Sequence, residues 1–262
     1  MSGLHVEVVG RGPPLVLRHG WAMHGGVFAP LIERLGAQHT MHVVDLPGHG
    51  HSRDCDVRLQ LQSATLAVLD AVPVAPWCGW SLGGLLALHA AAIRPDRVTA
   101  LAMLCATPKF VRSEDWPQGM PAATFRSFAD GLRDDWRGTL ARFIALEAFG
   151  SDHAREELRI LQQALFARGE PATRVLADGL ALLEDSDLRN VLPALAVPSL
   201  WIAGRRDRLV DPQAVHTASG NAPGGRYVRI EHAGHAPFLT HADHVANAVL
   251  DFLQSFDERM QA

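Results

Sequence analysis

Short apolar runs alternate with helical patterns along most of this chain, and this alternation limits the folds available to it. The runs cover residues 4–9, 14–20, 41–46, 75–80, 98–106, 198–204 and 226–231. Several are almost continuously apolar and end at Gly or Pro, which is typical of strands buried on both faces of a parallel sheet. Helical patterns cover residues 27–35, 59–71, 82–93 and 241–256. The alternation predicts an α/β fold in which helices flank a mostly parallel central sheet.

One interval, between about residues 107 and 197, contains no convincing strand. It begins with the polar stretch 110–124 and continues with helical patterns at 137–150, 151–169 and 172–188. In the second of these, apolar residues recur at helical spacing on one face, namely Ala154, Leu158, Leu161 and Leu165. We therefore expect a helical cap at 108–197, inserted after the strand that ends near Ala106. The core would comprise residues 1–107 and 198–262, with the cap over the carboxyl ends of the strands, where open α/β sheets bind ligands.

The composition excludes several classes of protein. With 262 residues, 48% of them hydrophobic and 20% charged, the chain can bury a large core. Its net charge of -4 argues against a nucleic-acid binder, and no apolar run approaches the ~20 residues of a membrane span. The first ten residues do not resemble a secretory signal. The three cysteines form no disulfide pattern. We expect a cytoplasmic monomer.

Histidine is abundant, which raises the question of a metal site. Of the 14 histidines, His49 and His51 are two residues apart, and His241 and His244 are three apart. Neither pair joins a cysteine or carboxylate at a familiar ligand spacing. We expect neither a metal nor another cofactor.

The sequence Gly79-Trp80-Ser81-Leu82-Gly83 places a serine between two glycines, after a predicted strand and before a predicted helix. This is the G-x-S-x-G context of a nucleophile elbow. A sharp strand-to-helix turn strains the serine backbone and crowds its neighbours, and glycines relieve the crowding. The turn also exposes the hydroxyl near a helix N-terminus, which favours negative charge. The alternative is that Ser81 merely caps the helix.

A nucleophilic serine needs a histidine base and a carboxylate that orients the histidine, here in the chain order Ser, acid, His. Asp207 and His235 each follow a predicted strand, so both lie at the edge of the sheet where Ser81 lies. The competing acids are Asp187, near the end of the cap, and Asp211, which precedes Pro212 and can cap the next helix. His232 competes with His235. The small neighbour Gly234 favours His235.

The predicted reaction also requires backbone donors for a developing oxyanion. One is the N–H of Leu82, the residue after the nucleophile. The other is the N–H of Trp21, delivered by the turn at His19 and Gly20 after an early strand. We assign His19 no direct chemistry.

These motifs together resemble the α/β-hydrolases. The matching segments are His-Gly-Trp (19–21), Asp-Leu-Pro-Gly-His-Gly-His-Ser (45–52), Gly-Trp-Ser-Leu-Gly-Gly (79–84), Asp207 and Gly-His-Ala-Pro-Phe (234–238). Glu-Asp-Trp-Pro (114–117) and the cap segment 142–150 make the chain most similar to the pimeloyl-[acyl-carrier protein] methyl ester carboxylesterase family of biotin synthesis, over essentially its whole length. The resemblance implies attack by Ser81 on the methyl ester of a carrier-bound pimeloyl chain. An acyl-enzyme forms, methanol leaves, and free small esters are further candidate substrates.

The resemblance also implies positions for substrate and partner. The positions that match the acyl channel of the family are Trp21, Trp80, Ser81, Leu82, Phe143, Ile144, Ala145, Leu146, Glu147, Leu209 and His235. Basic cap residues match those that contact the acidic carrier protein, namely Arg142, Arg155 and Arg159. A fourth family arginine falls on Gly138 here, with Arg137 beside it.

Two other readings remain open from the sequence. The same triad suits a general short-chain carboxylesterase or thioesterase, and a non-catalytic ligand-binding α/β-hydrolase can retain these residues. A dehalogenase is disfavoured because it requires an aspartate where Ser81 stands. Arg18 is unusual in a strand expected to be buried, since its charge must reach solvent or a carboxylate.

Overall fold

A seven-stranded sheet forms the centre of the computed structural model, which describes residues 3–261 and the side chains up to residue 255. Its strands are β1 (Val6–Gly10), β2 (Pro14–Arg18), β3 (Thr40–Val44), β4 (Ala75–Trp80), β5 (Val98–Leu104), β6 (Ser199–Gly204) and β7 (Arg226–Ile230). Their order is β1-β3-β2-β4-β5-β6-β7, with β1 antiparallel to β3 and every other pair parallel. The predicted α/β class and mostly parallel sheet are confirmed.

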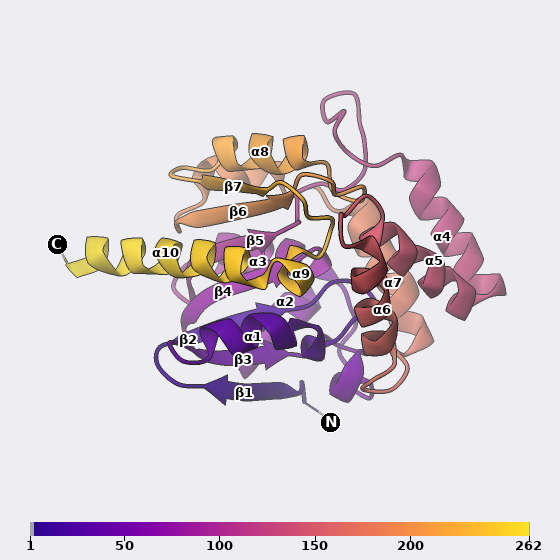
Figure 1. The fold of residues 1–262 in the computed structure, drawn as a ribbon, viewed down its shortest axis with the longest axis horizontal. Coiled ribbons are helices and arrows are strands. Elements are labelled where there is room, and N and C mark those ends of the chain that lie inside the picture. Colours follow the sequence, from indigo (N-terminus) through magenta and orange to yellow (C-terminus); the bar gives the residue numbers. More distant parts are fainter. Residues whose placement is uncertain (1–2, 262) are drawn as a thin grey trace.

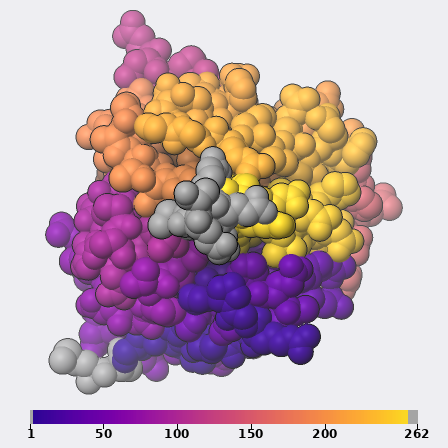
Figure 2. All heavy atoms as spheres, turned by 90° about the vertical axis from the view of Figure 1, so that its left-hand side faces the viewer, coloured from indigo at the N-terminus to yellow at the C-terminus, as the bar shows by residue number. Residues whose placement is uncertain are grey.

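Helices cover both faces of this sheet. In Figure 1, α1 (Ala29–Leu35) and α10 (Ala242–Gln261) lie in front of it, while α2 (Leu61–Ala71) and α3 (Leu82–Ile93) lie behind. Helix α8 (Pro212–Asn221) packs on β6, and the short α9 (Pro237–Thr240) leads into α10. Figure 2, viewed from the end opposite the cap, shows the yellow C-terminal segment between the indigo N-terminal segments and the orange segments near β7. No helix in the described part of the chain has the length and apolarity needed to cross a membrane.

Four helices separate β5 from β6: α4 (Ala122–Asp134), α5 (Trp136–Ala148), α6 (Ala154–Leu165) and α7 (Thr173–Asp185). They lie together at one end of the sheet (Figure 1). The sequence patterns predict α5, α6 and α7 but no helix over α4. The helical spacing of its apolar residues could have indicated this helix, namely Phe125, Phe128, Ala129 and Leu132. The helical cap in the predicted fold is therefore present, with one more helix than expected.

The strand predicted to end near Ala106 ends at Leu104 instead. Cys105 has a φ of 44°, in the left-handed region that is incompatible with a continuing strand. The backbone therefore turns away from the sheet directly after Leu104. This places Cys105 at the carboxyl end of β5, beside the loops that follow β6 and β7.

Arg18 reaches neither solvent nor a carboxylate. Its side chain is fully buried, and all three guanidinium nitrogens have no hydrogen-bond partner among the described residues. The guanidinium carbon lies 4.0 Å from the centre of the Trp77 ring, so a cation–π contact is its main compensation. Burial lowers the pKa of Arg18 well below its ordinary value. The expectation that the Arg18 charge reaches solvent or a carboxylate was therefore wrong.

Candidate active site

Ser81 joins β4 to α3 in a strained backbone conformation. Its φ and ψ are 54° and -120°, which few residues other than glycine adopt. The Ser81 side chain makes no capping hydrogen bond to α3, so the helix-cap alternative is wrong. Its N–H donates to the carbonyl of Leu104, fixing the turn against β5 (3.0 Å). The hydroxyl is thus free of a local structural role at the N-terminus of a helix, where negative charge is stabilised.

The two flanking glycines are required by close backbone approaches. A Cβ at Gly79 would lie 2.4 Å from the carbonyl oxygen of Gly83. A Cβ at Gly83 would lie 2.4 Å from the carbonyl oxygen of Arg18 and 2.5 Å from that of His19. Distances below about 3 Å are not tolerated by real side chains, so the strand, the turn and the helix pack here only with glycine.

His235 and Asp207 form a buried pair at the carboxyl ends of β7 and β6. The ring Nδ1 of His235 lies 2.7 Å from Oδ2 of Asp207, and both side chains are at most 1% exposed. The other carboxylate oxygen of Asp207 accepts the N–H groups of Leu209 (2.8 Å) and Val210 (3.0 Å). With Nδ1 donating to Asp207, Nε2 of His235 is left as an acceptor, and it has no hydrogen-bond partner in the part of the chain described.

The competing acids and histidine occupy other environments. Asp211 accepts the N–H of Gln213 and caps α8. Asp187 pairs with Lys109 and Arg189 at the surface. His232 is 66% exposed and pairs with Asp152. None of the three joins the buried pair of His235 and Asp207.

Backbone contacts from two directions hold the His235 loop. The indole N–H of Trp80 donates to the carbonyl of His235 (2.8 Å), and the two rings lie 5.6 Å apart. The N–H of His235 donates to the carbonyl of Glu147 on α5 (3.3 Å). Trp80 is fully buried and also packs against Phe238, so its ring lies beside the histidine loop. Trp80 is therefore placed to orient His235, a role that fits its contacts at least as well as contact with an acyl chain.

The turn at Gly20 presents the second predicted oxyanion donor. Nε2 of His19 accepts the N–H of Leu46 (2.9 Å), so its proton lies on Nδ1, which donates to the carbonyl of Gly20 (2.8 Å). Burial, and to a lesser degree the neighbouring His49, lowers the pKa of His19 to about 3, which keeps the ring neutral. Because a trans peptide directs its N–H opposite to its carbonyl, this bond fixes the direction of the Trp21 N–H. Leu82 is the first residue of α3, so its N–H has no partner within the helix.

Three buried groups lie beside the pair, and of these only Glu147 was a predicted site residue. Both carboxyl oxygens of Glu147 lack a hydrogen-bond partner within residues 3–255, and burial, reinforced by Asp207, raises the pKa of Glu147 well above its ordinary value. Burial also raises the pKa of Glu157, which accepts the hydroxyls of Ser151 and Thr240. Glu157 is therefore buried, although Arg155 and Arg159 on the same helix are exposed.

Cys105 is the third buried group. Its sulfur, a carboxylate oxygen of Asp207 and a ring nitrogen of His235 lie within 4.8 Å of one another. A metal at this point would need the thiolate, but burial and the neighbouring Asp207 raise the pKa of Cys105 well above its ordinary value. One carboxylate oxygen of Asp207 and Nδ1 of His235 are already joined by a hydrogen bond. The cluster therefore fits a hydrogen-bonded pair with a neutral thiol beside it.

The residues predicted to line an acyl channel lie in four different environments. Trp21 and Phe143 meet edge to face at 4.6 Å, and the indole N–H of Trp21 donates to the carbonyl of Leu176 on α7 (2.9 Å). Ile144, Glu147, Trp80, Leu82 and His235 are fully buried, while Ser81 is 3% exposed. Ala145, by contrast, is exposed to solvent on α5. Two others, Leu146 and Leu209, line a cavity.

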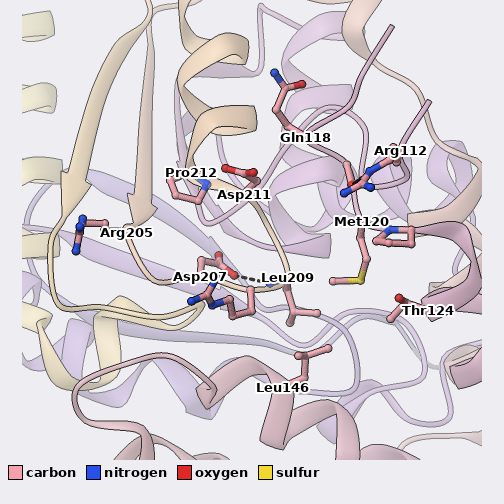
Figure 3. Close-up of a pocket in the computed structure, with 13 residues that line it drawn as sticks. Arg112, Gln118, Met120, Thr124, Leu146, Arg205, Asp207, Leu209, Asp211 and Pro212 are labelled. Carbon is pink, nitrogen blue, oxygen red and sulfur yellow. Dashed lines mark hydrogen bonds between the residues drawn. The ribbon is translucent and has the colours of Figure 1, made fainter. Parts of the chain in front are cut away.

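This cavity is a groove of about 480 Å³ between the cap and the loop that carries Asp207. Its lining residues are Arg112, Gln118, Gly119, Met120, Pro121, Thr124, Leu146, Arg205, Asp207, Arg208, Leu209, Asp211 and Pro212. Figure 3 shows Met120, Leu146 and Leu209 directed toward the same space, with Arg112 and Gln118 above them. The groove thus reaches one member of the predicted triad.

The predicted docking arginines are exposed on the cap. Arg137 stacks on Trp136 and pairs with Glu170, whereas Arg142 donates to the hydroxyl of Thr139. Arg159 donates to the side chain of Gln163 (3.0 Å). Within the described residues, Arg142, Arg155 and Arg159 have no carboxylate partner. Three of the four charges are therefore available to an acidic surface.

Comparison with known proteins gives close relatives. Residues 13–242 match the family described as the alpha/beta hydrolase fold. The pimeloyl-[acyl-carrier protein] methyl ester esterase of Stenotrophomonas maltophilia (strain R551-3) is 58% identical over 250 residues, covering 95% of this chain and 96% of that protein. The protein of the same name from Xanthomonas campestris pv. campestris (strain B100) is 56% identical, covering 95% of this chain and 98% of its own.

Solved structures of similar shape are more distant in sequence. The esterase EaEST from Exiguobacterium antarcticum has a TM-score of 0.84 at 21% identity, covering 96% of this chain and 95% of its own. The enol-lactonase from Burkholderia xenovorans LB400 has a TM-score of 0.83 at 23% identity, covering 96% of both chains. These likenesses establish the fold.

Proposed function

This chain belongs to the α/β-hydrolase fold family, and we propose that it is a serine carboxylesterase that hydrolyses the methyl ester of pimeloyl-[acyl-carrier protein]. The observation that carries the proposal is the buried pair of His235 and Asp207, combined with the strained elbow at Ser81. The near full-length similarity to esterases of that name supports the substrate. The product is a carrier-bound pimeloyl carboxylate for biotin precursor synthesis.

Ser81 is the nucleophile in the proposed mechanism. Nε2 of His235 takes the proton from the Ser81 hydroxyl as its oxygen attacks the ester carbonyl carbon. His235 then gives this proton to the departing methoxide, which leaves as methanol, and the pimeloyl chain remains esterified to Ser81. Water attacks this acyl-enzyme with His235 again acting as base, and the carboxylate product is released. Asp207 holds the Nδ1–H tautomer and stabilises the imidazolium in both steps.

The backbone N–H groups of Trp21 and Leu82 are the proposed donors to the tetrahedral oxyanion. Their support is the fixed Gly20–Trp21 peptide and the position of Leu82 at the start of α3. Such preorganised donors stabilise a charge that exists only in the transition state, and each is typically worth about a hundredfold or more in kcat. The neutral His19 ring acts as a positioning group in this arrangement.

We assign the acyl chain to the boundary between the cap and the core. Trp21, Phe143, Leu146 and Leu209 supply apolar surface beside the elbow, which suits a methylene chain. Residues 108–197 form the proposed cap over this boundary. The exposure of Ala145 removes it from the proposed lining, and Trp80 is assigned to holding His235.

The carrier protein would dock on the cap. Arg155 and Arg159 are exposed and four residues apart on α6, so they share a face. Arg142 on α5 is a third unpaired charge, while Arg137 is already engaged with Glu170. Acyl carrier proteins are acidic, which makes this surface complementary. The free, buried state of all three cysteines supports a location in the reducing cytoplasm.

A growth test separates this function from a general esterase. We expect the gene to restore growth without biotin to a bacterial strain that lacks its own pimeloyl-carrier methyl esterase, and Ser81→Ala to abolish the rescue. A wild-type gene that fails to rescue while its purified product hydrolyses p-nitrophenyl esters would favour the general carboxylesterase. Full binding of ester ligands with no turnover of any ester would favour a ligand-binding protein.

Docking has its own test. The double variant Arg155→Glu/Arg159→Glu is expected to raise KM for the carrier-bound ester about tenfold or more, because two favourable contacts become repulsive. Arg11→Glu is the matched control, since Arg11 is exposed in the turn between β1 and β2 on the core. Equal losses in the double variant and the control would contradict docking on the cap.

A further inference from the structure

The groove beside Asp207 combines three kinds of surface. Met120, Leu146 and Leu209 form an apolar floor (Figure 3). Gln118 and Thr124 add an amide and a hydroxyl at half-buried positions. Neither side chain makes a hydrogen bond to another of the described residues. Arg112 and Arg208 add positive charge at the exposed rim.

The charges in the groove are not cancelled by their neighbours. Arg112 donates only to the backbone carbonyl of Gly119 (3.1 Å), and Arg208 has no carboxylate within ion-pair distance among the residues the structure describes. Arg205 is already paired with Glu231 (3.2 Å). The two acids of the lining are also engaged: Asp207 bonds His235, and Asp211 caps α8. Two free cations therefore remain at the rim.

The groove lies where the part of the substrate beyond the acyl chain must run. The proposed substrate carries its methyl ester at the far end of the pimeloyl chain, and a thioester joins the other end to the arm of the carrier. When the ester lies at Ser81, the acyl chain fills the apolar slot and the arm must lie outside it. The groove reaches this slot through Leu146 and Leu209, which are both lining residues and proposed acyl contacts. It also begins on α5 one turn from Arg142, a proposed docking residue.

We infer that this groove binds the phosphopantetheine arm of the carrier protein, with Arg112 and Arg208 at its phosphodiester and Gln118 and Thr124 at its amides. The inference rests on the proposed function, because the arm belongs to a carrier-bound substrate. The arm has apolar methyl and methylene groups, two amides and one phosphodiester, and the groove offers a matching surface for each. Arginine suits a phosphodiester because its guanidinium makes two parallel charge-assisted hydrogen bonds.

Two synthetic substrates that differ only in the phosphate provide the test. One is the pimeloyl methyl ester thioester of pantetheine, and the other is the same thioester of 4′-phosphopantetheine. The wild-type protein is expected to show a kcat/KM about tenfold or more higher for the phosphorylated arm, since each contact with a charged group is worth about a factor of ten. Salt is expected to reduce this preference.

Arg112→Gln/Arg208→Gln should reduce the preference for the phosphorylated arm to near one. Arg126→Gln is the matched control, because Arg126 is exposed on α4 but does not line the groove. The inference is overturned if the wild type does not prefer the phosphorylated arm, or if the double variant keeps that preference. It is also overturned if the double variant loses kcat/KM equally for both arms. An effect seen only with the intact carrier protein also overturns it, because the arginines would then contact the carrier surface.

The amide contacts have a separate readout. Gln118→Ala/Thr124→Val is expected to lower kcat/KM for the pantetheine thioester roughly fivefold relative to the shorter N-acetylcysteamine thioester, which has one amide fewer. An equal change on both thioesters would contradict the assignment. A wild-type protein that releases no methanol from the carrier-bound ester would refute the proposed function itself. Because this is measured on the wild type alone, it is distinguished from a failure of the groove variants.

Discussion

Replacing Arg18 with methionine is expected to stabilise the protein. An unpaired buried charge carries an effective penalty of several kcal/mol, and the ring of Trp77 at 4.0 Å returns about 2 kcal/mol of it. Methionine is unbranched, so it can follow the path of the arginine stem and pack against Trp77 without a charge. The free energy of unfolding should therefore rise by about 1–4 kcal/mol. For a protein of this size, each kcal/mol raises Tm by about 2–4 °C.

Urea unfolding monitored by circular dichroism measures this change, with Arg18→Ala as the comparison. Alanine also removes the charge but leaves a cavity, so its stability should fall below that of Arg18→Met by a few kcal/mol. A methionine variant that is less stable than wild type by more than 1 kcal/mol, at an unchanged m-value, would refute the reasoning. That result would mean that the guanidinium is well compensated in the folded protein.

Three further predictions concern the site. Gly83→Ala should lose about 3 kcal/mol or more of stability, since its Cβ would lie 2.4 Å from the Arg18 carbonyl oxygen; unchanged urea unfolding would contradict the packing of the elbow. Glu147→Gln should gain stability over wild type by up to about 1.4 kcal/mol per pH unit above pH ~4.5, because the raised pKa makes folded Glu147 retain a proton that the unfolded chain releases. A pH-independent difference in urea unfolding would argue against a neutral buried Glu147. Trp80→Phe removes the donor to the His235 carbonyl, so kcat should fall with little change in KM; a rise in KM alone would return Trp80 to the acyl slot.

The sheet was predictable because several strands, such as β2 and β6, are nearly continuous apolar runs that begin or end at Pro or Gly. Helix α4 was not predicted because the polar stretch 110–124 runs into its first turn and obscured its start. The end of β5 was also misplaced, because the turn is set by the left-handed backbone of Cys105, for which the sequence has no marker such as glycine.

The proposed catalytic residues Ser81, Asp207 and His235 were chosen from chain order, since each follows a strand. Side-chain direction was harder to infer. Trp80 and Ala145 belong to matching segments, but one bonds the His235 carbonyl and the other faces solvent. Glu147 was expected in the acyl channel from the family resemblance, whereas Glu157 had no predicted role. Only the packing of α5 and α6 against the His235 loop shows that both are buried beside it.

The central claim is that Ser81 releases methanol from a carrier-bound pimeloyl methyl ester. Its most direct measurement is methanol release by the purified protein, compared with Ser81→Ala at equal concentration. We predict rapid release by the wild-type protein and a loss of at least about 10⁴-fold in kcat for the variant, as expected when a triad loses its nucleophile. Retention of substantial turnover by Ser81→Ala, or no release by the wild-type protein, would contradict the account.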